Sequence, residues 1–137
     1  MLDVELVSPE RVLFTGQATF VRVRTVGGGE IAFLTGHAPF IGALEICIAK
    51  IIAESGERFF AVHGGFVEVS DDKVTILSDV AELSDDIDVG RAEQARARAQ
   101  EALRTNPDDE EAAAALQRAE IRVEAASGAP ATTAVRH

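Results

Sequence analysis

Apolar and polar residues alternate over short runs in the first 83 residues of the chain. In residues 20–25, Val21 and Val23 fall on one side of an extended backbone and Arg22 and Arg24 on the other. This predicts a strand with one buried face and one wet face. Further apolar runs occur at residues 59–62, 66–69 and 74–77. Turn signals separate the runs roughly every 8–12 residues, which predicts an antiparallel sandwich or barrel.

The longest apolar run, residues 44–52, offers two competing faces. One side carries Leu44, Ile46, Ile48 and Ile52 and is interrupted by Lys50, whereas the opposite side carries Cys47 and Ile51. We expect a long strand here.

The period of the pattern changes at about residue 84. Residues 88–103 are rich in Ala, Arg, Glu and Gln, which are good helix formers. Asn106-Pro107 is expected to stop this helix and to start a second one, with Asn106 as its cap and Pro107 in the first helical position. We expect the second helix to run to about Ala126 and residues 127–137 to be disordered.

Small apolar residues recur at spacings of three and four along both predicted helices, which predicts an antiparallel hairpin with a close-packed seam. The seam residues are Ala92, Ala95, Ala99 and Ala102 in the first helix and Ala112, Leu116, Ala119, Val123 and Ala126 in the second. Apolar burial contributes roughly 25 cal/mol per Å², and alanine has little area to bury. Gly90 near the start of the first helix costs up to ~1 kcal/mol relative to alanine. We therefore expect a weakly held hairpin that can open or dock elsewhere.

Together these patterns predict a mainly β plus α fold. An N-terminal antiparallel β-sandwich is expected over residues 1–84, a C-terminal two-helix antiparallel hairpin over 85–126, and a disordered tail over 127–137. No helix-period stretch of useful length lies between the predicted strands, so a parallel α/β sheet is not expected.

The net charge of −10 over 137 residues argues against nucleic acid and anionic lipid surfaces as partners, because both are bound through Lys and Arg. No stretch approaches the ~20 apolar residues that span a bilayer, so no direct membrane insertion is expected. The start of the chain lacks the pattern of a secretory signal. The single cysteine, Cys47, cannot form an internal disulfide and is expected to be a small core or strand residue.

Residues that invite a catalytic or metal-binding interpretation are few. His37 and His63 lack further ligands at a supporting spacing, so we expect no metal site. No nucleophile, base and oxyanion donor can be assembled around His63, and no catalytic residue is expected. Glu82, Asp85 and Asp86 are interpreted as charges of the linker and the first helical turn rather than as paired catalytic carboxylates.

Four arginines of the predicted hairpin form a candidate anion site. Arg91 and Arg98 are seven residues apart and Arg118 and Arg122 four apart, so each pair shares a helix face. If the two faces converge, the guanidinium groups repel one another unless an anion such as a triphosphate lies between them. The alternative is a solvated surface with ordinary Glu–Arg pairs, such as Glu120 with Arg96 or Arg98.

Three segments resemble the epsilon subunit family of the bacterial F-type ATP synthase. The segment 29–40, GEIAFLTGHAPF, matches the family's glycine–histidine–alanine–proline signature, with Thr35 and Phe40 where proline and leucine are usual. The segment 60–69 resembles the family's glycine–glycine hairpin. The segment 87–92, which opens the helical region, resembles a nucleotide-binding motif of some bacterial members, although Gly90 replaces a larger residue.

The resemblance implies a non-catalytic rotor subunit of the central stalk, peripheral on the cytoplasmic face of the bacterial inner (plasma) membrane. Its partners would be the gamma subunit, the membrane-embedded c-subunit ring and, when the hairpin is extended, the alpha and beta subunits of the catalytic head. The loop that contacts gamma or the ring would include Glu30, His37, Ala38 and Pro39. No cofactor is required, but the hairpin would bind regulatory ATP. The residues implied for that site are Glu82, Ile87, Asp88, Arg91, Ala92, Arg98, Arg118 and Arg122.

Two other functional classes compete with this hypothesis. A small enzyme on a sandwich scaffold would need a convergent polar pocket, which the sequence does not supply. A generic adaptor whose hairpin binds another helix would explain the alanine seam but not three motifs in this order.

Overall fold

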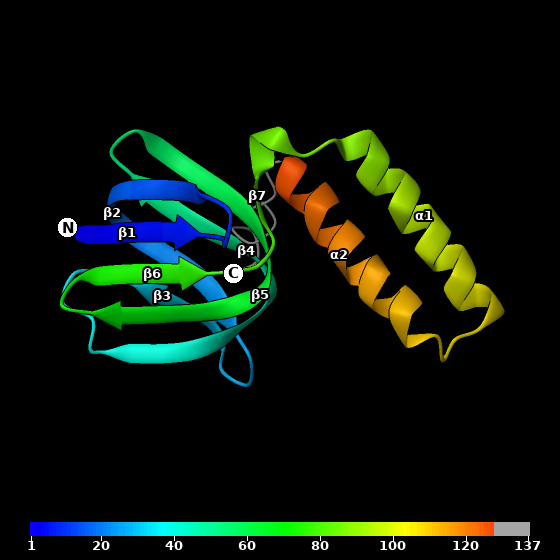
Figure 1. The fold of residues 1–137 in the computed structure, drawn as a ribbon, viewed down its shortest axis with the longest axis horizontal. Helices are drawn as coiled ribbons and strands as arrows, with labels where there is room; N and C mark the ends of the chain where they lie inside the picture. Colours follow the sequence, from blue (N-terminus) through cyan, green and yellow to red (C-terminus); the bar gives the residue numbers. More distant parts are fainter. Residues whose placement is uncertain (128–137) are drawn as a thin grey trace. The chain divides into compact units, whose positions relative to one another are not determined.

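The computed structural model describes residues 1–127, which form seven strands, a 3₁₀ turn and two helices (Figure 1). The strands are β1 (Leu2–Val7), β2 (Val12–Thr25), β3 (Gly29–Phe33), β4 (Phe40–Ala53), β5 (Gly56–Ser70), β6 (Lys73–Leu77) and β7 (Ala81–Leu83). The 3₁₀ turn is Ser84–Asp86, and the helices are α1 (Val89–Thr105) and α2 (Glu110–Ala126). The chain divides into two compact units, of which the first is Met1–Leu83 and the second begins at Ser84.

Hydrogen-bonded neighbours close the first unit on itself. The strand order is β1-β6-β5-β4-β2, and β1 also pairs with β2, while β3 extends from β2 and β7 from β5. All of these pairs are antiparallel except β1 with β6, which is parallel. The predicted fold class, a β-sandwich followed by two helices, is confirmed, and the parallel pair is a feature that local patterns do not predict.

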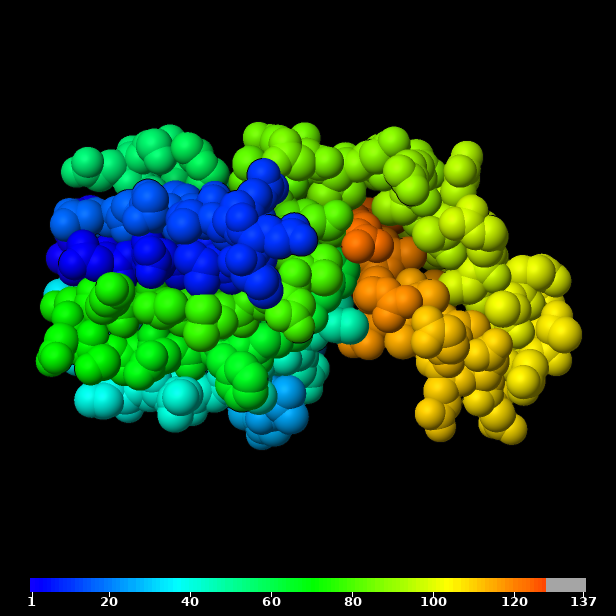
Figure 2. Space-filling model, viewed as in Figure 1, coloured from blue at the N-terminus to red at the C-terminus, as the bar shows by residue number. Residues whose placement is uncertain are grey.

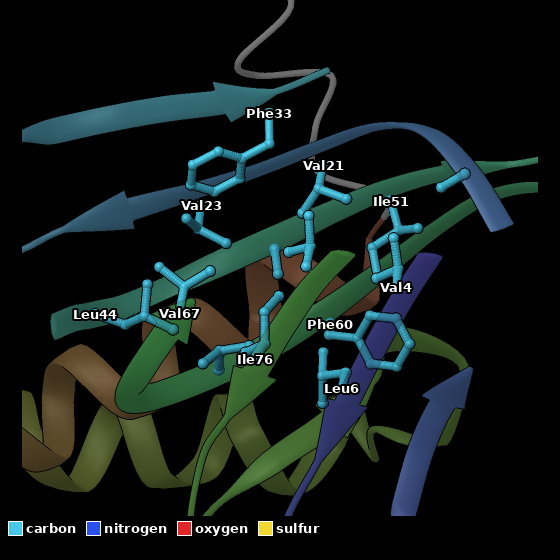
Figure 3. Packing of buried hydrophobic residues seen from close by; sticks show 14 of the residues in the cluster. Val4, Leu6, Val21, Val23, Phe33, Leu44, Ile51, Phe60, Val67 and Ile76 are labelled. Carbon is cyan, nitrogen blue, oxygen red and sulfur yellow. The ribbon is translucent and has the colours of Figure 1, made fainter. Parts of the chain in front are cut away.

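Alternating side chains of the strands form the core of the sandwich. On β2, Val21 and Val23 are fully buried, whereas Arg22 is half-buried and Arg24 exposed, as the alternation predicts. Large apolar side chains from β1, β3, β4, β5 and β6 meet them between the two faces of the sandwich (Figure 3). Burying such side chains is the dominant favourable term in folding, so this unit has a core of its own.

The buried side of β4 is the side with fewer isoleucines. Cys47, Ala49 and Ile51 are buried, and their cross-strand partners on β5 include Val62 and Phe60. Opposite residues of an antiparallel pair share a face, so the other isoleucines of the run are directed away from the core. Leu44 is buried as well, because the register between β2 and β4 shifts there. The outer, isoleucine-rich side of β4 is therefore apolar without belonging to the core.

Two glycines bend β5 where it changes partner from β7 to β6. Gly64 and Gly65 have φ values of +85° and +123°, which side chains with a Cβ rarely adopt. A Cβ on Gly65 would collide with the carbonyl oxygen of Leu77 and approach the Cα of Ser78 to 2.9 Å. The buried Ser78 hydroxyl lies 2.7 Å from the carbonyl oxygen of Gly64 and can donate to it. This close contact fixes the bend.

Aspartates begin both helices of the second unit. The carboxylate of Asp88 accepts a hydrogen bond from the Arg91 N–H at 3.2 Å, and that of Asp109 accepts one from the Ala112 N–H at 3.0 Å. The predicted cap of the second helix, Asn106, is therefore wrong. Asn106 instead follows the last residue of α1, and its side-chain oxygen accepts from the Asp108 N–H at 3.1 Å. Asn106-Pro107 ends the first helix but does not begin the second.

The helices α1 and α2 pack on each other along the predicted seam. Ala92, Ala99, Ala112 and Ala119 are buried, and the other seam residues are half-buried. We call these four buried residues the alanine seam. Of the tail predicted to be disordered, residues 128–137 lie outside the described part of the chain. Within the described part, no helix is long and apolar enough to cross a membrane.

Candidate functional site

The loop 34–40 contains three of the four residues predicted to contact a partner. The His37 N–H donates to the Leu34 carbonyl oxygen at 3.1 Å, and Gly36, with φ +88°, occupies the third position of this turn. A turn of type II has these features and favours proline in its second position, which Thr35 occupies here. The turn therefore explains why proline also suits that position.

The His37 ring is held by aromatic neighbours. Its centroid lies 4.9 Å from that of Phe33 and 6.5 Å from that of Phe40, with both contacts edge-on. The ring Nδ1 lies 2.7 Å from the Ala38 carbonyl oxygen, a contact in which Nδ1 carries the hydrogen. Ala38 and Pro39 are exposed beside the ring. The loop thus presents a small surface of fixed shape, and no cluster of potential metal ligands occurs among the described residues.

The fourth predicted contact residue, Glu30, does not belong to this loop. It lies on β3 opposite Arg24, with which it forms an exposed ion pair at 3.6 Å. Three residues of extended strand separate it from the start of the loop at Leu34. The structure therefore brings His37, Ala38 and Pro39 together and leaves Glu30 apart from them.

An exposed apolar row crosses the outer face of the sandwich, and local sequence patterns do not reveal it. Strand register aligns one residue from each of five strands, since opposite residues share a face. The row is Ala43 on β4, Phe66 on β5, Leu77 on β6, Val7 on β1 and Val12 on β2. Phe66, Leu77 and Val12 are 57%, 48% and 54% exposed. Figure 2 shows part of this face, where β1, in dark blue, lies between β2 and the green β6.

The surroundings of the apolar row are acidic. The adjacent row on the same face includes Glu68 on β5 and Glu5 on β1, together with the 71% exposed Ile41 on β4. Contiguous exposed apolar patches bordered by polar residues mark protein interaction sites. The arrangement suits a partner with an apolar surface and basic residues around it.

The positions of four arginines along the two helices place them on one edge of the helical hairpin. Arg91 and Arg98 each precede a residue of the alanine seam in α1, and Arg118 precedes one in α2, with Arg122 one turn further on. Because the helices run in opposite directions, positions that precede the seam on both helices lie along the same edge. The Arg118 guanidinium is 3.5 Å from a carboxylate oxygen of Glu111 on the same helix. The pair suggested for Glu120 with Arg96 or Arg98 does not form among the described residues.

The remaining predicted nucleotide-binding residues fall into both units. Ile87 and Asp88 lie just before α1, and the buried Ala92 belongs to the alanine seam. Glu82 lies on β7 of the first unit, where its carboxylate is 3.1 Å from Nε2 of His63. Asp85 and Asp86 lie in the 3₁₀ turn between β7 and α1. They belong to the expected linker and not to the first turn of α1.

Cys47 is the one cysteine, and it is buried in the sandwich core. Desolvation by burial is the main reason that the pKa of its thiol is raised above the ordinary value, although Arg24 opposes the shift. A thiol with a raised pKa is a poor nucleophile at neutral pH. Cys47 is therefore a structural residue, as expected.

The chain thus combines a β-sandwich whose strands close on themselves with a two-helix hairpin packed along alanines. The family model for the ATP synthase delta/epsilon chain beta-sandwich domain matches residues 1–84, and the one for the long alpha-helix domain of the same chain matches residues 85–127. The chain therefore belongs to the delta/epsilon family of ATP synthase subunits, which are non-catalytic parts of that complex.

Individual relatives agree with this family. The ATP synthase epsilon chain of Streptomyces griseus is 43% identical over 125 residues, which cover 90% of this chain and 94% of the relative. The ATP synthase epsilon chain of Brevibacillus brevis is 46% identical over 103 residues, covering 74% and 77%. A chain in a structure of the Euglena gracilis mitochondrial ATP synthase has the same fold, with a TM-score of 0.69 and 24% identity over 98% of this chain and 81% of that chain.

Proposed function

We propose that this chain is a rotor subunit of the central stalk of an F-type, proton-translocating ATP synthase. It couples rotation of the membrane-embedded c-subunit ring to the catalytic head, and its C-terminal hairpin regulates ATP hydrolysis. The subunit lies on the cytoplasmic face of the bacterial inner membrane, held there by its protein partners. Family membership supports this role, and the exposed surfaces of the sandwich suggest how it is performed.

The observation that carries the coupling role is the apolar row on the outside of the sandwich. Exposed Phe66, Leu77 and Val12 on adjacent strands form a surface that a partner subunit can bury. We assign this surface to the gamma subunit, because a permanent rotor contact requires a sizeable apolar area. The exposed loop 34–40 is assigned to the c-subunit ring. Two partner surfaces on one rigid unit allow the sandwich to link the ring to the shaft.

The hairpin acts as the regulatory element. Its helices meet through the alanine seam, in which small side chains bury little area. The hairpin therefore has two states, and a ligand shifts the equilibrium between them by its difference in affinity for each. In one state the hairpin is folded on the sandwich and hydrolysis proceeds. In the other it extends towards the alpha and beta subunits, where its arginines contact acidic surfaces and block rotation.

ATP is the ligand that favours the folded hairpin. The edge formed by Arg91, Arg98, Arg118 and Arg122 carries four guanidinium groups, and Glu111 is an ion-pair partner of Arg118. Guanidinium groups bind phosphate oxygens in a bidentate manner, so a triphosphate relieves the repulsion along this edge. When ATP is plentiful, bound ATP therefore keeps the hairpin in the folded state, in which hydrolysis proceeds.

The coupling and regulatory roles are tested on rotary ATPase stripped of this subunit. The full-length chain and a version ending at Asp86 are added separately, and binding and ATP hydrolysis are measured. We expect both versions to bind and only the full-length chain to slow hydrolysis. If both bind and neither slows hydrolysis, the regulatory role is wrong but the coupling role stands. If neither binds, the proposed function is wrong.

ATP binding is tested by calorimetric titration of the full-length chain. Arg91→Ala and Arg98→Ala should each weaken binding about ten-fold, which corresponds to about 1.4 kcal/mol. Arg104→Ala is the matched control, since Arg104 is an exposed arginine of α1 that pairs with Glu101 at 2.7 Å and is not one of the four arginines of this edge. Equal loss in all three variants would mean that net charge, and not this edge, governs binding.

A further inference from the structure

The partner-binding loop 34–40 is tied to a distant turn of the sandwich. The Gly36 N–H donates to a carboxylate oxygen of Asp72 at 2.7 Å, across 36 residues of sequence. Hydrogen bonds to an ionised carboxylate are shorter and about twice as strong as neutral ones. This contact links the loop to the turn between β5 and β6.

Asp72 is itself held in place by its backbone. It has φ +62° and its neighbour Asp71 has φ +51°, a pair of left-handed residues that is typical of a tight hairpin turn. The Asp72 carbonyl oxygen accepts a hydrogen bond from the Asp3 N–H at 2.8 Å. The carboxylate therefore projects from a position fixed by three strands, β1, β5 and β6.

The Gly36 amide, which Asp72 holds, determines the conformation of the exposed part of the loop. Gly36 is the residue of the turn with positive φ, and His37, which follows it, closes the turn and packs on Phe33. Ala38 and Pro39 come directly after His37 in the exposed part of the loop. Fixing the Gly36 amide thus fixes the start of the segment that we assign to the ring.

We propose that Asp72 is a positioning residue that pre-organises the loop 34–40 for binding its partner subunit. The inference rests on the proposed function, which makes this loop a contact surface. A loop ordered before binding avoids paying for its ordering during binding. Without the Asp72 carboxylate the loop keeps its sequence but loses its fixed shape, and affinity falls although no contact residue has changed.

The test compares two substitutions in the same turn. Asp72→Gly removes the carboxylate, and glycine accepts the left-handed conformation. Asp71→Gly is the matched control, because it removes the same charge from an adjacent left-handed residue whose side chain is exposed. Asp72→Asn is the rescue variant, since its amide oxygen still accepts from Gly36 and asparagine tolerates positive φ.

Binding of each full-length variant to ATP synthase stripped of this subunit is measured together with amide hydrogen exchange at Gly36 and the melting temperature. We expect Asp72→Gly to weaken binding about ten-fold and to speed Gly36 exchange about ten-fold. Asp71→Gly should match the unmodified chain, and Asp72→Asn should lie within about three-fold of it. Binding and exchange are compared at a temperature at which every variant is folded.

Equal affinity of Asp72→Gly and Asp71→Gly, with the unmodified chain bound, would overturn the inference and leave the proposed function intact. Faster Gly36 exchange without weaker binding would also overturn it, because the bond would then be structural only. If the unmodified chain does not bind the stripped complex, the proposed function fails and the inference fails with it.

Discussion

The sandwich and the hairpin solve the same packing problem with side chains of different size. The largest fully buried side chains of the sandwich include Phe33, Phe60, Leu2 and Leu6, whereas the buried residues shared by the two helices are alanines. Deleting a buried phenylalanine typically costs about 3–5 kcal/mol, and an alanine has no comparable side chain to lose. The core of the sandwich is therefore the more strongly held, and separating the two helices would cost less free energy.

The weaker packing of the hairpin makes it the part of the chain on which a regulatory ligand can act. A ligand that binds a weakly packed hairpin can change its state without disturbing the sandwich, because the sandwich has its own closed set of strands. Regions of low local stability are where moving elements are commonly found.

The bend of β5 should be the most sensitive backbone position in the sandwich. Gly65→Ala places a Cβ against the Leu77 carbonyl oxygen, in a strand that has hydrogen-bonded neighbours on both sides. This collision should lower the free energy of unfolding by about 4 kcal/mol or more. Gly64→Ala is the control. Its Cβ would have 3.8 Å to the nearest backbone atom, so it bears only the strain of positive φ, about 1 kcal/mol. Denaturant unfolding of both variants measures the difference, and equal losses would contradict the collision.

The hairpin should respond to loss of a cap while the sandwich does not. Asp109→Ala removes the acceptor for the Ala112 N–H and should destabilise α2 by about 1 kcal/mol. Asn106→Ala should cost about half as much or less, since Asn106 does not begin the helix. Helix content followed by circular dichroism during heating gives both values. A larger loss in Asn106→Ala would restore the capping role predicted from sequence.

The loop 34–40 offers a stabilising change confined to the sandwich. Thr35→Pro places proline in the second position of the turn, where its fixed φ is suitable, and should raise the free energy of unfolding by about 0.4–1 kcal/mol. Thr35→Ala serves as the control and should change it by less. Chemical denaturation of the sandwich provides the measurement, and destabilisation by proline would show that the turn is not of type II.

Ionisation of the Cys47 thiol should be linked to unfolding of the sandwich and not to opening of the hairpin. Burial raises the pKa of its thiol in the folded state, so the unfolded chain releases the proton first as the pH rises. Stability from this group is therefore complete below the unfolded pKa, about 8.5, and is lost as the pH rises above it. Cys47→Ala should flatten this decline, which is followed by measuring the free energy of unfolding as the pH rises above about 8.5. A native thiol that reacts with alkylating reagents as fast as free cysteine would contradict its burial.

Local patterns in the sequence predict the elements better than their partners. The alternation of Val21 and Val23 with two arginines predicts its strand correctly, because one face of that strand is buried. The alanine spacing predicts the hairpin correctly, because the two helices meet along these alanines. The buried side of β4 was not predictable, since both of its sides are apolar and only register with β5 decides between them. Likewise Asn106-Pro107 fits a helix start, but Asp109 supplies the cap three residues later.

Some features of the candidate surfaces can be recognised in one sequence segment, whereas others depend on which strands pair. A continuous motif marks the loop 34–40, but its tie to Asp72 joins residues that are distant in sequence. The apolar row draws one residue from each of five strands, so no segment shows it before the register is known. Glu30 shares a motif with His37 and yet lies apart from it, because the remaining three residues of β3 separate Glu30 from the loop.

Residue-resolved hydrogen exchange of the full-length chain tests the central contrast most directly. We expect amides of α1 and α2 to exchange through openings of lower free energy than those of the core strands β2, β4 and β5. Added ATP should slow exchange in the helices alone. Equal opening free energies in both units, unaffected by ATP, would show that the hairpin is a fixed part of one cooperative structure and would contradict its role as a switch.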